Sequence, residues 1–191
     1  MYFFKGNTLS EDILLKVLEI NDVHHFLELK DEWNRVLARS KDNNIFLTWE
    51  YLSTFWKHFG KKARLRILLC INHKEEIISI APLRQSRYDI VGPFGYNVIE
   101  PLGYRGLMPE GGDYTGLILG EKEAECFKLF LNYLIEHDNW DFIYLYDIPA
   151  TSAILDIIYK ISEPITKFEI TNGAICPYIS LPNSIEILIS R

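Results

Sequence analysis

The chain has 191 residues, of which 48% are hydrophobic and 14% aromatic, enough apolar side chain to bury the core of one globular domain. Its formal net charge is -6, with acidic and basic residues mixed along the chain, so it lacks the dense basic block that binds a phosphate backbone. Apolar runs such as ILLCI are too short to cross a bilayer, and residues 1–15 lack the basic-then-apolar pattern of a secretory signal.

We therefore expect one cytoplasmic domain with no nucleic-acid partner and no membrane span. The three cysteines, Cys70, Cys126 and Cys176, are widely spaced and set among apolar neighbours. This arrangement favours buried free thiols over disulfides or a metal site. His24 and His25, with Glu28 one turn on, fall short of a metal-binding constellation.

Strand and helix signals alternate in the first third of the chain. The segment 13–20 predicts a strand, and Asn21 or Asp22 can cap the helix that follows. Apolar residues at helical spacing predict one helix over 24–39. A second helix follows, with Thr48 as its cap, Gly60 as its stop and apolar residues at i, i+3, i+7 and i+10: Trp49, Leu52, Trp56 and Phe59. The aromatic members of this stripe either fill the core or line an acyl pocket.

The hydrophobic period then changes to that of strands. Two apolar runs, 64–72 and 76–85, flank a short polar turn and predict a hairpin. Short extended pieces are expected at 88–92 and 98–103, followed by a Gly/Pro-rich loop at 103–112 and a strand at 113–119. A helix at 121–137 then leads to a central strand covered on both faces at 141–148. A helix at 151–161 and strands at 165–171 and 174–181 complete the expected elements. This order predicts an α/β fold with a mixed, mostly antiparallel sheet and helices on both faces.

Five blocks of sequence carry a family resemblance: FLTWEYLSTFWKHFG (46–60), LRILLCI with EEIISIAPL (65–83), GGDYTGLIL (111–119), WDFIYLYDIP (140–149) and CPYISLP (176–182). Their order looks like the GNAT acyltransferase fold. More specifically, the chain resembles the N-terminal half of the CelD/BcsL-type acetyltransferases, relatives of the FemAB-like aminoacyl transferases. The resemblance implies one GNAT-like domain over 1–182, followed at 183–191 by the start of a helix or of a linker to a second half.

In that family the acyl donor is bound mainly by the C-terminal half. The resemblance therefore implies an enzyme that moves an acetyl or other acyl group from coenzyme A to an amine or hydroxyl of a small molecule or envelope precursor. This chain would supply the acceptor side and would need a second GNAT-like half, or self-association. Acetyl-coenzyme A, or another acyl-coenzyme A, would be the donor for the complete enzyme and would not bind tightly to this chain alone. The alternatives are a standalone acetyltransferase with a degenerate coenzyme A site and a non-catalytic binding or assembly module.

The turn LGEKEA (119–124) stands where GNAT enzymes carry an Arg/Gln-x-x-Gly-x-Gly/Ala turn that binds the pyrophosphate of coenzyme A. It has one glycine and no Arg or Gln before it. Glu121, Glu123 and Glu125 crowd the first helical turn, where carboxylates stabilise a helix but repel a pyrophosphate. No cofactor-binding site is recognisable in this sequence.

The loop 103–116 holds the candidate acceptor residues Arg105, Asp113 and Tyr114. Arg105 can grip a carboxylate or phosphate in bidentate fashion, and Asp113 or Glu110 can accept a proton from an amine nucleophile. Asp113 and Tyr114 can equally begin a strand, with the glycines serving turns.

The resemblance also makes Tyr159 a candidate catalytic residue. In GNAT enzymes, a tyrosine near this place protonates the departing thiolate of coenzyme A. A structural role is the alternative, because Ser152 and Leu155 stand where the typical motif has Asn and Ala.

Overall fold

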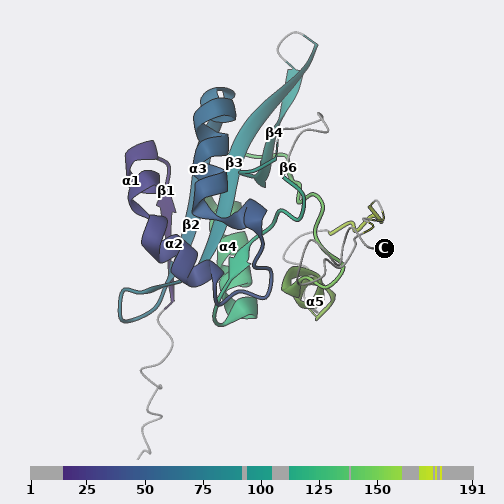
Figure 1. Cartoon of the computed structure of the whole chain (residues 1–191). Helices are drawn as coiled ribbons and strands as arrows, with labels where there is room; N and C mark the ends of the chain where they lie inside the picture. Colours follow the sequence, from purple (N-terminus) through teal and green to yellow (C-terminus); the bar gives the residue numbers. More distant parts are fainter. Residues whose placement is uncertain are drawn as a thin grey trace, which may run out of the picture.

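The computed structural model of the protein describes residues 15–91, 94–104, 112–137, 139–160, 168–173, 175 and 177. The described strands form one six-stranded sheet with the order β1-β2-β3-β4-β6, and β5 pairs with the start of β3 (Figure 1). The strands are β1 (Lys16–Ile20), β2 (Ala63–Ile71), β3 (Ile77–Val91), β4 (Phe94–Pro101), β5 (Ile118–Leu119) and β6 (Phe142–Ile143). Of the described pairings, only β4 with β6 is parallel, so the predicted mixed, mostly antiparallel sheet is confirmed.

Helices cover both faces of this sheet (Figure 1). The α-helices are α1 (Val23–Glu28), α2 (Lys30–Leu37), α3 (Trp49–Phe59), α4 (Glu123–His137) and α5 (Ala153–Lys160), and the 3-10 helices are η1 (Ile45–Leu47) and η2 (Gly60–Lys62). α1, α2 and α3 pack on one face, and α4 and α5 pack on the other.

Strand β2 lies in the middle of these layers. Its residues Ile67 and Leu69 belong to the apolar cluster under α1–α3, whereas Leu68 and Cys70 belong to the cluster under α4 and α5. Successive side chains of a strand point to opposite faces, so a strand buried on both faces requires an unbroken apolar run. The run ILLCI meets this requirement.

The helix around Trp49 forms as its capping residues predict. The Thr48 hydroxyl oxygen accepts from the Tyr51 backbone N–H at 3.3 Å, and Gly60 follows the last helical residue. The side chains buried most deeply are Leu52 and Phe55, whereas Phe59 is 43% exposed. The stripe therefore lies partly outside the core.

One helix expected over 24–39 is in fact two. α1 ends at Glu28, and Leu29, at φ -80° and ψ 2°, separates it from α2. The break leaves Phe26 and Trp33 both fully buried, with ring centroids 5.5 Å apart. The break lets both rings pack in the core, so we attribute the division into two helices to this packing.

The strand predictions after the hairpin need correction. The strand expected at 113–119 shrinks to β5, because Tyr114 (φ 53°) and Gly116 (φ 157°) leave the extended conformation. The strand expected at 141–148 shrinks to β6, which is last in the order of the described strands. Phe142 is 51% exposed, so the prediction that both faces of this strand are covered was wrong.

The remaining predicted segments divide between described and undescribed residues. The helix expected at 151–161 is α5, and α4 begins two residues later than expected, after Lys122 at φ 48°. Residues 168–173 form no strand, and the rest of 165–171 and most of 174–181 lie outside the described residues. Within the described ranges, no helix is long and apolar enough to cross a membrane.

Candidate functional site

The structure places the predicted site residues in different surroundings. Arg105 and Glu110 lie outside the described residues. Asp113 and Tyr114 are exposed in the segment before β5 and do not begin a strand. Tyr159 is 72% exposed near the end of α5. The structure therefore supplies no buried, positioned hydroxyl at Tyr159.

A buried carboxylate that the sequence did not reveal lies between β3 and β4. Glu100 is fully buried, and it faces α3 because Leu102, two positions on, packs in the cluster under α1–α3. Its carboxylate accepts from Ser86 Oγ at 2.6 Å and from Tyr88 Oη at 2.8 Å, and it pairs with Arg84 Nη2 at 2.9 Å. These three partners are alternate residues of β3, so they share one face of the sheet.

The charges in this cluster compensate each other. Arg84 neutralises Glu100, and the guanidinium carbon lies 5.9 Å from the ring centroid of Phe55 on α3. Burial, followed by the hydrogen bond to Glu100, raises the pKa of Tyr88 well above its ordinary value. Glu100 already accepts two hydrogen bonds and an ion pair, so it is poorly placed to act as a base and instead orders the sheet beneath the surface.

Three tyrosines gather beyond the carboxyl ends of β4 and β6. Tyr104 and Tyr146 stack with ring centroids 3.7 Å apart and planes 9° from parallel, and Tyr144 meets Tyr146 edge to face. Burial, and then the hydrogen bond with Tyr104, raises the pKa of Tyr146; burial also raises the pKa of Tyr104. Both phenols therefore stay protonated at neutral pH and can donate hydrogen bonds. These rings lie just beyond the ends of β4 and β6, the parallel pair among the described strands.

The segment before β5 is tied to these tyrosines. Gly112 N–H donates to Gly103 O at 3.1 Å, and Thr115 Oγ1 donates to Tyr146 O at 2.7 Å. Tyr51 of α3 lies against the same segment, since a Cβ built on Gly112 would be 2.9 Å from its hydroxyl oxygen. Asp113 lies between these contacts in the chain, and its charge acts on Tyr51.

We call Tyr51, Tyr104, Tyr144, Tyr146 and Asp113 the tyrosine site. Burial, and then the charge of Asp113, raises the pKa of Tyr51, so its phenol too is protonated at neutral pH. Asp113 is the exposed carboxylate within this group and the member able to accept a proton from a nucleophile. The arrangement can hold a small polar molecule by phenol hydrogen bonds and activate it at Asp113.

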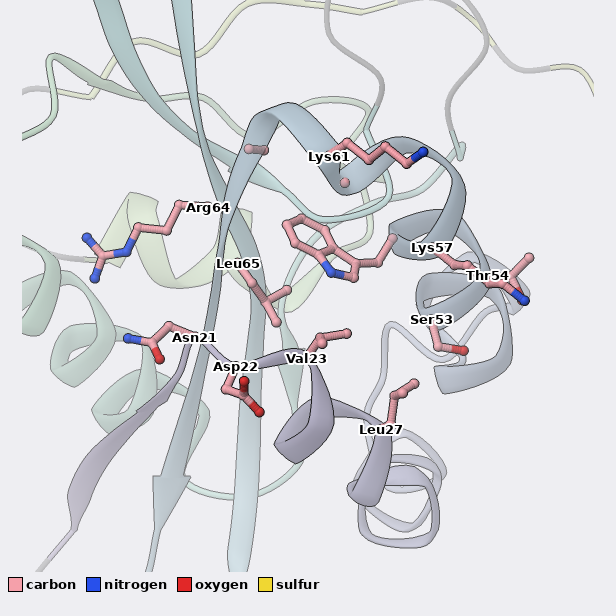
Figure 2. Close-up of a pocket in the computed structure, with 13 residues that line it drawn as sticks. Asn21, Asp22, Val23, Leu27, Ser53, Thr54, Lys57, Lys61, Arg64 and Leu65 are labelled. Atoms are coloured by element: carbon pink, nitrogen blue, oxygen red, sulfur yellow. The ribbon is translucent and has the colours of Figure 1, made fainter.

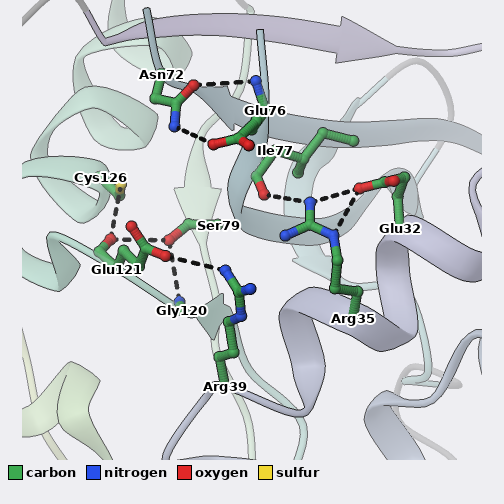
Figure 3. Close-up of polar contacts among 10 residues, drawn as sticks. All are labelled: Glu32, Arg35, Arg39, Asn72, Glu76, Ile77, Ser79, Gly120, Glu121 and Cys126. Atoms are coloured by element: carbon green, nitrogen blue, oxygen red, sulfur yellow. Dashed lines mark hydrogen bonds and ion pairs between the residues drawn. The ribbon is translucent and has the colours of Figure 1, made fainter. Parts of the chain in front are cut away.

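The turn at Gly120 packs against the sheet (Figure 3). Gly120 N–H donates to Ser79 Oγ at 3.2 Å, and Glu121 N–H donates to Ile78 O at 3.2 Å. A Cβ at Gly120 would be 2.6 Å from Ile78 O, which explains the glycine as a close approach between two backbones. Two backbone amides of this turn, those of Gly120 and Glu121, are therefore already bonded within the protein.

The acidic residues of this turn pair with the segment that follows α2. Glu121 Oε1 lies 3.1 Å from Arg39 Nη1, and Glu123 Oε2 lies 3.1 Å from Lys41 Nζ. These exposed pairs each contribute at most about 1 kcal/mol. These pairs explain the acidic residues of the turn as structural contacts, without a ligand.

A separate open groove of about 900 Å³ lies between α1, α3 and the start of β2 (Figure 2). Its apolar lining is made by Val23, Leu27, Trp56 and Leu65, and its basic side chains are Lys57, Lys61 and Arg64. None of its lining residues belongs to the tyrosine site. Trp56 therefore lines a surface groove, but Asp113 is not among the residues that line it.

In the described part of the chain, no group of three or more His, Cys, Asp or Glu side chains is arranged to hold a metal ion.

The chain matches no model of a known protein family and no curated protein. It is similar to the solved structure of a point mutant of the BH1408 protein from Bacillus halodurans, with 12% identity over 84% of this chain and 99% of that chain, and a TM-score of 0.44. A tetramutant of the same protein gives 11% identity over 83% of this chain and 99% of that chain, also with a TM-score of 0.44. At this level of similarity, the function has to be argued from the site itself.

Proposed function

We propose that this chain is the N-terminal, GNAT-like domain of a CelD/BcsL-type acyltransferase and that it supplies the acceptor side of the reaction. The element order and the mostly antiparallel sheet between two helical layers support the proposal, as do the sequence blocks that carry the resemblance. The acceptor is a small molecule or envelope precursor that carries an amine or a hydroxyl.

The observation that carries the proposal is that the segment holding Asp113 is bonded through Thr115 to the backbone of Tyr146, next to the stacked Tyr104, and that the charge of Asp113 acts on Tyr51. The protonated phenols of Tyr104 and Tyr146 hold the polar groups of the acceptor. Asp113 accepts the proton as the amine or hydroxyl attacks the acyl carbon of the thioester. The carbon–sulfur bond then breaks, and the proton passes on to the departing thiolate, so that coenzyme A leaves as its thiol. The buried Glu100 cluster fixes β4 just before the turn that leads to Tyr104.

The Gly120 turn supports a donor site on a second half. Its first two amides are bonded to β3, and its carboxylates face outward to Arg39 and Lys41. On this account, acyl-coenzyme A binds to the partner half, and this chain presents the acceptor to it.

The groove between α1 and α3 favours one alternative, a standalone acetyltransferase with an unconventional donor site. Lys57 and Lys61 offer positive charge to a pyrophosphate, and Trp56 offers an apolar wall to the pantetheine arm. If this alternative holds, the isolated chain binds acyl-coenzyme A, and the binding requires Lys57 and Lys61.

The test is acyl transfer by the native assembly. The tagged chain is isolated from its source cells with whatever it binds, and transfer from labelled acetyl-coenzyme A to pooled amines and alcohols is measured. Asp113→Asn and Tyr146→Phe should each lower transfer at least tenfold while the same partners are recovered. Asp31→Asn, an exposed carboxylate on α2, is the matched control and should leave transfer unchanged. Equal transfer by all four proteins, or no transfer by the wild type, would overturn the proposal.

A further inference from the structure

The strongest unassigned feature is a pair of thiols in the core under α4 and α5. Cys70 of β2 and Cys126 of α4 are both fully buried and are 56 positions apart in the sequence. Their sulfurs are hydrogen-bonded to each other at 3.1 Å. A disulfide needs about 2.05 Å, so a movement of roughly 1 Å would bring the sulfurs within bonding distance.

We propose that Cys70 and Cys126 form a site of reversible oxidation, in which a peroxide converts the two thiols to a disulfide that joins β2 to α4. This inference does not depend on the acyltransferase assignment. Both residues are free thiols in the structure, so the reduced form is the one described here.

The surroundings distinguish the two sulfurs. Cys126 lies in the first turns of a 15-residue helix, and its sulfur also contacts Glu121 O at 3.4 Å (Figure 3). Its hydrogen bond with Cys70 lowers the pKa of Cys126. Burial opposes this shift, whereas the Ser79 hydroxyl and the charge of Lys122 add to it. The same hydrogen bond raises the pKa of Cys70. The start of α4 favours a thiolate at Cys126, so Cys126 is the sulfur that reacts first, and Cys70 is the sulfur that closes the bond.

The reaction has two balanced steps. The Cys126 thiolate attacks one peroxide oxygen, so that an S–O bond forms, the O–O bond breaks and water leaves after proton transfer. Cys70 then loses its proton and attacks the Cys126 sulfur, so that the S–S bond forms and the sulfenic oxygen leaves as a second water. Two electrons pass from the sulfurs to the peroxide, and an external thiol reverses the change. Burial selects a small oxidant such as hydrogen peroxide over a disulfide of glutathione size.

The bond would have a structural consequence, because β2 and α4 belong to different layers. Joining them closes a long loop and restricts the unfolded chain more than the folded one. The oxidised protein should therefore melt roughly 5–10 °C above the reduced protein, if the folded state accepts the bond without strain.

The experiment treats the full chain with hydrogen peroxide, blocks remaining thiols under denaturing conditions and maps peptides without reduction. The expected product is a peptide pair joined through Cys70 and Cys126, two hydrogen atoms lighter than the sum and released by dithiothreitol. The same product should form in Cys176→Ser, which removes the remaining cysteine of the chain. Neither Cys70→Ala nor Cys126→Ala should show the rise in Tm on oxidation.

Peptide mapping of the wild type keeps the proposal testable even if an alanine variant fails to fold. Recovery of Cys70 and Cys126 as separately blocked thiols after peroxide treatment would overturn it. So would a linkage of either residue to Cys176 instead, or oxidation of Cys126 to a sulfinic acid without any cross-link.

Discussion

Arg84 and Glu100 form an almost fully buried ion pair across β3 and β4, with Nη2 2.9 Å from Oε1. The two residues are direct partners in the antiparallel register. Buried charges are stable only when paired and hydrogen-bonded, and Ser86 and Tyr88 complete the set around Glu100. The pair fixes β4 just before the turn that leads to Tyr104.

Glu100→Ala should therefore destabilise the protein by roughly 3–5 kcal/mol, because it leaves the Arg84 charge buried and uncompensated. Urea unfolding at neutral pH measures this change. Asp89→Ala is the matched control, since it removes one partner of the exposed Arg87–Asp89 pair and should cost less than about 1 kcal/mol. Equal losses in the two variants would show that Glu100 is not the buried partner described here.

The buried phenols predict a loss of stability in alkali. The pKa of Tyr146 is raised by burial above the unfolded value of ~10, so its contribution is complete below about pH 10 and is lost as the pH rises further. Free energies of unfolding measured between neutral pH and alkali should fall more steeply for the wild type than for Tyr146→Phe. Tyr159→Phe, which changes an exposed side chain, should follow the wild type. Identical slopes in the wild type and Tyr146→Phe would argue against the stacked, half-buried phenol described for Tyr146.

The Gly120 turn gives a prediction about backbone packing. Gly120→Ala places a Cβ 2.6 Å from Ile78 O, so β3 and the turn must separate. We expect a loss of about 1–3 kcal/mol, of the size that overpacking causes. Gly173→Ala is the control, because a Cβ there meets nothing within 4 Å. Thermal melts of both variants compare the two positions, and an unchanged Tm in Gly120→Ala would contradict the described contact.

The sequence predicted the elements whose signals are local. Thr48 and Gly60 mark the ends of α3 through their capping preferences, and the polar turn between 64–72 and 76–85 marks the hairpin. The burial of Cys70 and Cys126 as free thiols also followed from their apolar neighbours. Each of these features depends on a few adjacent residues.

The segment 141–148 shows where local patterning fails. An unbroken apolar run predicts a strand buried on both faces, but here the aliphatic Ile143 and Leu145 pack toward α4 and α5 while Phe142 and Tyr144 are half exposed. Aromatic side chains count as apolar in the pattern, yet a tyrosine can lie at a surface with its hydroxyl in water. The run therefore could not distinguish a strand covered on both faces from a strand with one exposed face.

The candidate site was predicted only in part. Asp113 was identified from its place in a long polar loop, but Glu100 was not, because its partners are set by the register of β3 against β4. Likewise, the stacking of Tyr104 on Tyr146 depends on the parallel pairing of β4 with β6, which joins residues 42 or more positions apart. Contacts of this kind are decided by tertiary structure.

The central claim is that this chain presents the acceptor and leaves the acyl donor to a second half. Calorimetric titration of acetyl-coenzyme A into the purified, cooperatively folded chain tests it most directly. The account predicts no saturable heat up to millimolar donor. Micromolar binding by the wild type would contradict it, and loss of that binding in Lys57→Gln with Lys61→Gln would place the donor in the groove between α1 and α3.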